Sequence, residues 1–227
     1  MSAITETTSS VISENVRRLV RLVLGQEIPL SSVATPTGPF LRRSNGLREF
    51  WRGIDPPPGL QILDLGQASQ ANISFITNRG YKLYTEDLLK AVLAFPAGEK
   101  ASAERLEERF FRENLHHAEG QFAGILCWDL LDFMADPLVK PVVDRLHYFL
   151  RPGGNLLTFF HTGLTGQDVP VHQYRIGAED SLEVIGRGAG KLRRHFNNRA
   201  IENLFRRFSS LKFYLSRNNL REVVIAR

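Results

Sequence analysis

Four short apolar runs of this 227-residue sequence each end on residues that could do chemistry. The residues at these four ends are Gly66, Glu86 with Asp87, Trp128 with Asp129, and His161. The runs have the length of buried strands, and in open α/β sheets ligands bind beyond the carboxyl ends of the strands. We therefore expect these residues to gather around one binding cleft.

Gly66 and Asp87 predict a nucleoside site. Gly66 allows a tight turn, after which the next helix directs unpaired backbone N–H groups at a ligand. Asp87 lies 21 residues further on, about where a dinucleotide or nucleoside site places the carboxylate that binds both ribose hydroxyls. Glu86 could take that role instead. Both acids could equally begin a helix, where negative charge is favourable.

The other two strand ends carry an aromatic side chain, an acid and a histidine. Trp128 could form the wall of a nucleoside pocket or pack in the core. Asp129 could cap the next helix or point into the cleft, and His161 could be structural or act as a general base with a pKa of about 6.5. His116 and His117 have no cysteine or carboxylate partner at ligand spacing, so we predict no metal site.

The elements that position these residues alternate between strand and helix. The apolar pattern predicts strands at 60–65, 81–85, 122–128, 155–160, 211–215 and 220–225, and helices at 70–79, 87–95, 100–113, 138–150 and from Asn197 or Asn198 onward. Such alternation is typical of a parallel sheet with helices on both faces. The last two strands predict an antiparallel hairpin through 216–219 that closes the sheet.

Residues 1–58 predict a helical N-terminal extension. Its first ten residues, 1–10, are expected to be disordered, and an amphipathic helix follows over 12–23. Ser44 is placed to cap a second helix that runs to Trp51, and a proline run then ends the extension.

Residues 59–227 predict one domain that contains a polar excursion. The excursion, 162–195, is rich in glycine and shows two short strand patterns, near 173–176 and 182–185. Because it interrupts the alternation of strand and helix, we expect it to shape a substrate pocket together with the N-terminal helices.

Four stretches of this domain resemble the motifs of the class I S-adenosylmethionine-dependent methyltransferases. The stretches are 61–66, 80–87, 121–129 and 150–157, which are similar to the family's first, second, fourth and fifth strands with their flanks. The terminal hairpin is similar to the family's sixth and seventh strands. The resemblance covers roughly 59–227 and is carried by the order of the motifs together.

The resemblance implies a doubly wound, Rossmann-like α/β fold whose mostly parallel seven-stranded sheet ends in a C-terminal antiparallel hairpin strand. It implies S-adenosylmethionine as the cofactor and methyl transfer, with a small molecule as the favoured acceptor. The cofactor-binding positions that it implies are Asp64, Gly66, Gln67, Ala68, Gln70, Asn72, Glu86, Asp87, Asn114 and Trp128. The positions that it leaves for catalysis are Asp129 and His161.

The sequence also departs from the family. The family's first motif usually continues as G-x-G-x-G, but the second and third glycines fall on Ala68 and Gln70. Gln70 could block the methionine end of the cofactor or bind it through its amide. A catalytically inactive, methyltransferase-like binding or scaffolding protein is therefore the alternative. The missing third glycine and the terminal hairpin argue against a nicotinamide-dependent oxidoreductase.

Two further departures affect the adenine site and the acceptor. No clear pattern marks the family's third strand, so Glu113 and Asn114 are the candidates for the adenine edge. The stretch 129–132 is Asp-Leu-Leu-Asp, which differs from the Asp-Pro-Pro-Tyr type of many enzymes that methylate nitrogens of nucleic-acid bases. That subclass is therefore disfavoured.

Composition and charge narrow the class of protein. The single Cys127 excludes an internal disulfide framework. No apolar run reaches the roughly 18–20 residues that cross a membrane, and we expect a cytoplasmic protein. The net charge is +5, but 187–227 holds eleven basic residues and two acids. This basic segment, 187–227, suggests either a nucleic-acid partner or a solvated surface.

Overall fold

The computed structural model describes residues 38–54, 59–94, 102–215 and 220–227. The helix expected at 12–23, the disorder expected at 1–10 and the hairpin turn at 216–219 therefore lie outside the described residues. The contacts divide the chain into two units, Met1–Pro36 and Thr37–Arg227. Everything described below belongs to the second unit.

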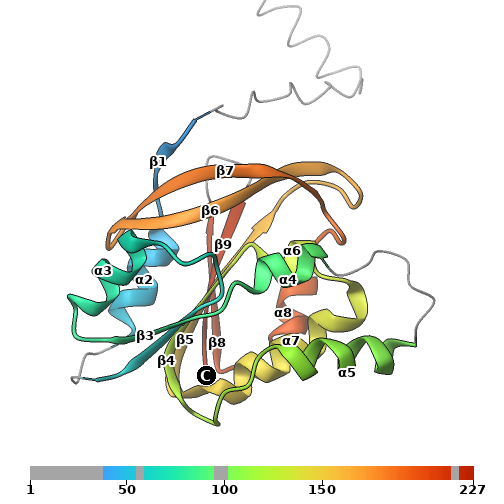
Figure 1. The fold of residues 1–227 in the computed structure, drawn as a ribbon, viewed down its shortest axis with the longest axis horizontal. Coiled ribbons are helices and arrows are strands. Elements are labelled where there is room, and N and C mark those ends of the chain that lie inside the picture. The colour runs from blue at the N-terminus through green and yellow to red at the C-terminus, as the bar shows by residue number, and fades with distance from the viewer. Residues whose placement is uncertain (1–37, 55–58, 95–101, 216–219) are drawn as a thin grey trace, which may run out of the picture. The chain divides into compact units, whose positions relative to one another are not determined.

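A six-stranded sheet forms the centre of this unit, in the order β3-β2-β4-β5-β9-β8 (Figure 1). Its strands are β2 (Gln61–Asp64), β3 (Lys82–Thr85), β4 (Phe122–Trp128), β5 (Leu150–His161), β8 (Ser210–Leu215) and β9 (Leu220–Ala226). The four strands from β3 to β5 are parallel, and β9 pairs antiparallel with both β5 and β8. The α/β fold and the antiparallel C-terminal hairpin strand are thus confirmed.

The predicted count of seven strands is wrong for the described residues, because no strand forms beside β3. The segment between the helix Ala103–Glu113 and β4 instead makes contacts with Glu86, the residue that follows β3. The backbone N–H of Leu115 and Nε2 of His117 lie 2.8 and 3.2 Å from the carboxylate oxygens of Glu86. Leu115 also has a positive φ of 61°, which lies outside the extended region that regular strands adopt.

Helices cover both faces of the sheet (Figure 1). They are α2 (Asn45–Arg52), α3 (Gln70–Thr77), α4 (Leu88–Ala94), α5 (Ala103–Glu113), α6 (Leu130–Phe133), α7 (Asp136–Phe149) and α8 (Asn198–Leu204). Helices α4 to α8 share one apolar core with the inner strands, whereas α2 and α3 belong to a second core. The helices expected from the apolar pattern in the described residues therefore form, within a few residues of the expected ends.

A second sheet of three antiparallel strands accompanies the first. Its order is β1-β7-β6, with strands β1 (Phe40–Arg43), β6 (Asp168–Ala178) and β7 (Ser181–Lys191). The two strands expected near 173–176 and 182–185 are therefore real but much longer. Figure 1 shows the β6–β7 hairpin passing across the ends of the central strands. The second core joins the two sheets, because it contains residues of β4, β5, β6 and β7.

Helix α2 begins as expected from the sequence. Ser44 is its N-cap, and the Ser44 hydroxyl accepts a hydrogen bond of 3.0 Å from the backbone N–H of Leu47. Phe50 and Trp51 on this helix are buried in the second core. The domain boundary between residues 58 and 59 stays a prediction. Among the described helices, none has the length and apolarity needed to cross a membrane.

Candidate functional site

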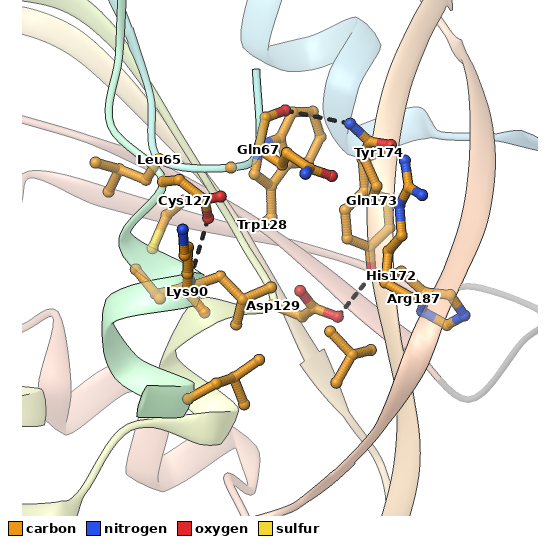
Figure 2. Close-up of a pocket in the computed structure, with 16 residues that line it drawn as sticks. Leu65, Gln67, Lys90, Cys127, Trp128, Asp129, His172, Gln173, Tyr174 and Arg187 are labelled. Carbon is orange, nitrogen blue, oxygen red and sulfur yellow. Dashed lines mark hydrogen bonds between the residues drawn. The ribbon is translucent and has the colours of Figure 1, made fainter. Parts of the chain in front are cut away.

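A cavity of about 370 Å³ lies where β2 and β4 end, beside α4 and the β6–β7 hairpin (Figure 2). Its volume falls within the roughly 300–1,000 Å³ of small-molecule sites. The residues that line it are Leu65, Gly66, Gln67, Asp87, Leu89, Lys90, Leu93, Cys127, Trp128, Asp129, Leu130, Val171, His172, Gln173, Tyr174 and Arg187. Five of the predicted site residues, Gly66, Gln67, Asp87, Trp128 and Asp129, are thus brought together.

Asp64 organises the turn beneath this cavity. It is fully buried and accepts hydrogen bonds from Nε1 of Trp128 at 2.7 Å, from Nδ2 of Asn72 at 2.8 Å and from the backbone N–H of Gly66 at 3.0 Å. Burial raises the pKa of Asp64, and these three donors oppose that effect. A Cβ added at Gly66 would lie 2.8 Å from the Trp128 indole, so glycine is required here by close packing.

Asn72 connects the same turn to the second sheet. Its Nδ2 donates to the Tyr174 carbonyl at 3.1 Å, and its Oδ1 accepts from the backbone N–H of Ile176 at 2.8 Å. Asn72 is buried and does not line the cavity. The structure thus gives Asn72 a role in holding β6 against the first turn, where the sequence predicted cofactor contact.

Trp128 and Tyr174 form the wall between the two sheets. Their rings stack with centroids 5.1 Å apart and planes 12° apart. The Tyr174 hydroxyl donates a hydrogen bond of 2.9 Å to Oδ2 of Asp129, which Figure 2 shows as a dashed line. Trp128 has a positive φ of 52°, which is uncommon for a bulky residue and marks a strained turn at the end of β4.

The structure separates the two acids that follow β3. Asp87 lines the cavity, and its Oδ1 also accepts from the backbone N–H of Lys90 at 3.1 Å at the start of α4. Asp87 thus begins α4, as one interpretation expected, and also faces the cavity, while its binding of a ribose stays a prediction. Glu86 is held away by Leu115 and His117. His117 thus has a carboxylate partner after all, one that is remote in sequence.

Three other predicted cofactor residues lie outside the cavity lining. Gln70 is exposed, and its Nε2 donates to the Ser74 hydroxyl at 3.0 Å, so it does not fill the space above Gly66. Ala68 is exposed at the turn. Asn114 donates to the Phe110 carbonyl at 2.8 Å at the end of α5. The motif pattern does not encode where these three side chains point.

The two predicted catalytic residues differ in access to the cavity. Asp129 lines it, whereas His161 lies behind it, with its Nδ1 2.9 Å from Oδ2 of Asp132. Burial raises the pKa of Asp129 to about 6, although the His161 charge and the Tyr174 hydroxyl favour the carboxylate. Burial disfavours a charged His161, but the hydrogen bond to Asp132 and the Asp129 charge together raise its pKa. Burial also raises the pKa of Asp132, which the His161 hydrogen bond opposes.

Strands β6 and β7 contribute to the lining side chains that no sequence pattern predicted. These side chains include His172, Gln173, Tyr174 and Arg187. Burial lowers the pKa of His172 to about 4, and the charges of His161 and Arg42 add to this effect. No spacing pattern ties these residues to the strand ends, although the whole segment 162–195 was expected to shape a pocket. In the part of the chain described here, no residue before Leu65 lines the cavity.

The basic segment, 187–227, is partly neutralised by ion pairs in its described part. Several of its basic side chains pair with acids elsewhere in the fold. These ion pairs are Lys191–Asp168, Arg194–Asp136, Arg207–Asp144, Lys212–Glu49 and Arg227–Glu119. They support a structural and solvated role for the positive charge.

No protein-family model and no curated protein matches this chain. Its structure is similar to that of a TehB-like SAM-dependent methyltransferase from Corynebacterium glutamicum, with 13% identity, a TM-score of 0.45 and coverage of 97% of this chain and 99% of that one. It is also similar to Burkholderia thailandensis 1,6-didemethyltoxoflavin-N1-methyltransferase, solved with 1,6-didemethyltoxoflavin and S-adenosylhomocysteine (14%, 0.43, 100% and 91%). A third is Haemonchus contortus phosphoethanolamine N-methyltransferase 2 in complex with S-adenosyl-L-methionine (12%, 0.45, 81% and 52%).

All three are methyltransferases, the class whose motifs the sequence resembles. Identity and TM-score are both low. The fold class therefore rests on the strand order described above, and the function on the site itself.

Proposed function

We propose that this protein is an S-adenosylmethionine-dependent methyltransferase with a small-molecule acceptor. The observation that carries the proposal is the meeting of Gly66 and Asp87 on the wall of one cavity, at the carboxyl ends of β2 and β3. A turn that exposes backbone N–H groups and a carboxylate that can accept from ribose hydroxyls are what a nucleoside cofactor requires.

The lining divides into a cofactor part and an acceptor part. Asp87 would bind the ribose, the Gly66–Gln67 turn would face the methionine portion, and apolar side chains of α4 such as Leu89 and Leu93 would contact the adenine. The remaining side chains, on β6, β7 and the end of β4, would surround the acceptor. The bound cofactor supplies a methyl group on a sulfonium, which is already a good leaving group.

The protein then has to orient the acceptor and exclude water. If methylation releases a proton from the acceptor, the protein also has to accept that proton. The stacked Trp128 and Tyr174 close one side of the cavity and exclude water from it. Asp129 reaches the cavity with Oδ1 unpaired and a pKa of about 6, which suits a proton acceptor near neutral pH. His161 sits behind Asp129 and, when charged, favours its carboxylate form.

One observation favours the alternative, an inactive binding or scaffolding protein. The Asp64 carboxylate is engaged by three groups of the chain itself, so fewer of its lone pairs are available to a ligand. Against this, Gln70 leaves the cavity open. Release of S-adenosylhomocysteine from S-adenosylmethionine in the presence of a panel of small acceptors would exclude the alternative.

Calorimetric titration of the full chain with S-adenosylhomocysteine tests the proposed cofactor site. We expect one site per chain, with a Kd in the micromolar range, and a loss of about tenfold or more in affinity in Asp87→Ala, equal to ~1.4 kcal/mol. Asp168→Asn, at the start of β6 and outside the cavity, should bind as the unaltered chain does. No heat from folded protein at millimolar ligand, or an unaffected Asp87→Ala variant, would refute the proposal.

A further inference from the structure

Three buried side chains from separate strands converge beside the cavity. Asp129 follows β4, His161 ends β5 and His172 lies on β6, and one potential ligand atom from each lies within 4.8 Å of the others. Their exposed fractions are 0%, 6% and 9%. Asp129 and His172 also line the cavity, so this cluster, Asp129–His161–His172, has an open side.

Hydrogen bonding leaves this cluster incomplete. Oδ1 of Asp129, Nε2 of His161 and Nδ1 of His172 are buried without a hydrogen-bond partner. Buried polar atoms in folded proteins are nearly always paired, and an unpaired one costs the desolvation of that group. Three such atoms in one cluster indicate that a further species belongs between them.

Hydrogen bonds from neighbouring residues orient His161 and Asp129 in the way that metal ligands are usually oriented. Oδ2 of Asp132 accepts from the His161 backbone at 2.6 Å and lies 2.9 Å from His161 Nδ1. With its proton on Nδ1, His161 directs the lone pair of Nε2 into the cluster. The Tyr174 hydroxyl binds Oδ2 of Asp129 at 2.9 Å and leaves Oδ1 for a ligand. Such carboxylate–histidine pairs are typical of metal sites.

The backbone beside His172 is irregular in a way that favours a site. The β6–β7 pairing shifts register between Val171 and His172, so that Arg187 on β7 has no partner in the ladder. Gly188 next to it has a φ of +129°. Bulges of this kind redirect side chains and are common beside functional sites.

Charge points in the same direction. Asp129 and Asp132 are both buried, and the two arginines whose charges act on Asp132 and His161, Arg221 and Arg42, each bind another group. Arg42 pairs with the buried Glu222, and Arg221 donates to the Phe196 carbonyl at 2.8 Å. A divalent cation would balance the two carboxylates without an additional charged side chain.

We propose that Asp129, His161 and His172 bind one divalent transition-metal ion of the Zn²⁺ type. Two imidazoles and one carboxylate are a donor set that suits Zn²⁺ and leaves a fourth position open. Bonds of 2.0–2.1 Å place tetrahedral donors about 3.3 Å apart. The ligand atoms of the cluster lie within 4.8 Å of one another, so the two that are farthest apart must approach each other when the metal binds. The sequence predicted no metal because the three donors are far apart along the chain.

The open position faces the cavity through Asp129 and His172. If the proposed methyltransferase function holds, a metal-bound acceptor would carry an oxygen or nitrogen donor, and the metal would lower the pKa of that group. Asp129 would then act as a ligand instead of a proton acceptor. The metal site itself stands without the cofactor, so its test is a binding measurement.

The test is a Zn²⁺ titration of the full chain, purified without a histidine tag and stripped with chelator, against a competing chromophoric chelator. We expect one Zn²⁺ per chain, and at least tenfold weaker binding in His161→Ala, His172→Ala and Asp129→Asn. Asp132→Asn should weaken binding by about 10–100-fold because it releases the His161 ring. His195→Ala, an exposed histidine whose Nδ1 bonds the Gly163 carbonyl, is the matched control.

X-ray absorption spectra of the unaltered Zn²⁺-loaded chain keep the test decisive if a variant fails to fold. We expect nitrogen and oxygen neighbours with the multiple scattering of two imidazoles, and no sulfur from Cys127. Absence of stoichiometric Zn²⁺, unchanged affinity in folded His161 and His172 variants, or a spectrum without two imidazoles would overturn the proposal. Ordered water would then account for the unpaired atoms.

Discussion

Tyr174 of β6 stacks on Trp128 at the end of β4, with their ring centroids 5.1 Å apart. The Tyr174 hydroxyl also donates a hydrogen bond to Asp129, the residue that follows Trp128. This one side chain therefore packs the second sheet against the central sheet and forms part of the cavity wall. Both contacts are buried, with Tyr174 3% exposed and Trp128 4% exposed. Stability and ligand access should therefore depend on the same residue.

Changes at Tyr174 should separate these two contacts. Tyr174→Phe keeps the stack but leaves Oδ2 of Asp129 unpaired, which should cost about 1–3 kcal/mol in the free energy of unfolding. Tyr174→Ala also removes the ring and should cost about 3–5 kcal/mol. Urea unfolding measures both. Tyr148→Phe, at a side chain that is 42% exposed, should change stability by less than about 0.5 kcal/mol, and equal costs for the two Tyr174 variants would refute this division.

Gly66→Ala should displace the Trp128 indole. The added Cβ would lie 2.8 Å from two atoms of that ring, so the indole must move and its bond to Asp64 weaken. We expect S-adenosylhomocysteine affinity to fall by about tenfold or more, or ~1.4 kcal/mol, by calorimetry. Gly186→Ala on β7 has no atom within 4 Å of its new Cβ and is the control. Equal affinities in the two variants would show that the turn does not shape the ligand site.

The buried ion pair between Arg42 and Glu222 should be strongly coupled. Their side chains are 4% and 3% exposed, and Glu222 also accepts from the Ser44 hydroxyl and the Gly46 backbone. Arg42→Met should cost about 3–5 kcal/mol because it leaves Glu222 buried without its cation. Arg42→Met combined with Glu222→Met should cost clearly less than the sum of the single changes.

A double-mutant cycle by chemical denaturation measures that coupling. Arg43→Met is the matched control on the neighbouring residue. The Arg43 side chain is 85% exposed, and its ion pair with Asp180 is long, at 3.7 Å. We expect it to change stability by less than about 0.5 kcal/mol. Additive effects of the Arg42 and Glu222 changes would contradict the prediction.

The contact of α2 with β8 should depend on pH. The Lys212 ammonium donates to Glu49 at 2.5 Å and lowers the pKa of Glu49 below its ordinary value. Because the folded-state pKa is the lower one, the stabilisation is complete above the ordinary pKa and is lost as pH falls through the folded-state pKa. Glu49→Gln should therefore be less stable than the unaltered chain at pH 7 and equally stable in acid.

Urea midpoints measured across the acid range check this. Glu202→Gln on α8 is the control, since Glu202 is exposed. A Glu49→Gln penalty that stays constant down to the acid limit would show that packing, and not the ion pair, carries the contact.

The basic segment, 187–227, should not bind nucleic acid at physiological salt. Arg194 already pairs with Asp136 and lies over the Phe196 ring, and Arg207 pairs with Asp144. We expect no binding of RNA or DNA by fluorescence anisotropy at 150 mM salt, about the ionic strength at which exposed charges more than ~8 Å apart are screened. Specific binding that falls steeply with salt and is lost in Arg193→Glu with Arg194→Glu would contradict this.

Local patterns were enough to predict most of the central sheet and its helices. Ser44 and Asn197 cap α2 and α8 as expected, because an N-cap is set by a few consecutive residues. The antiparallel β8–β9 pair follows from two apolar runs and a short connection. The approach of Gly66 and Asp87 was also predictable, since parallel strands bring their carboxyl ends to one edge.

Other features depended on the tertiary structure alone. Only the fold shows that Asp87 faces the cavity while Glu86 binds Leu115, because adjacent residues can point in opposite directions at a strand end. The absence of a seventh strand from the described residues likewise reflects contacts made at the end of β3. The convergence of Asp129 with His172 needs a hairpin from the polar excursion to pack across the central strands.

The sequence by itself determined where most strands and helices form, and therefore the edge of the sheet at which the cavity lies. Those properties are local, since periodicity and caps act over a few residues. The tertiary structure decided which side chains share that edge. Tyr174 and Trp128 are 46 positions apart in the chain, and their contact arises from the burial of two sheets against one another, which no local spacing encodes.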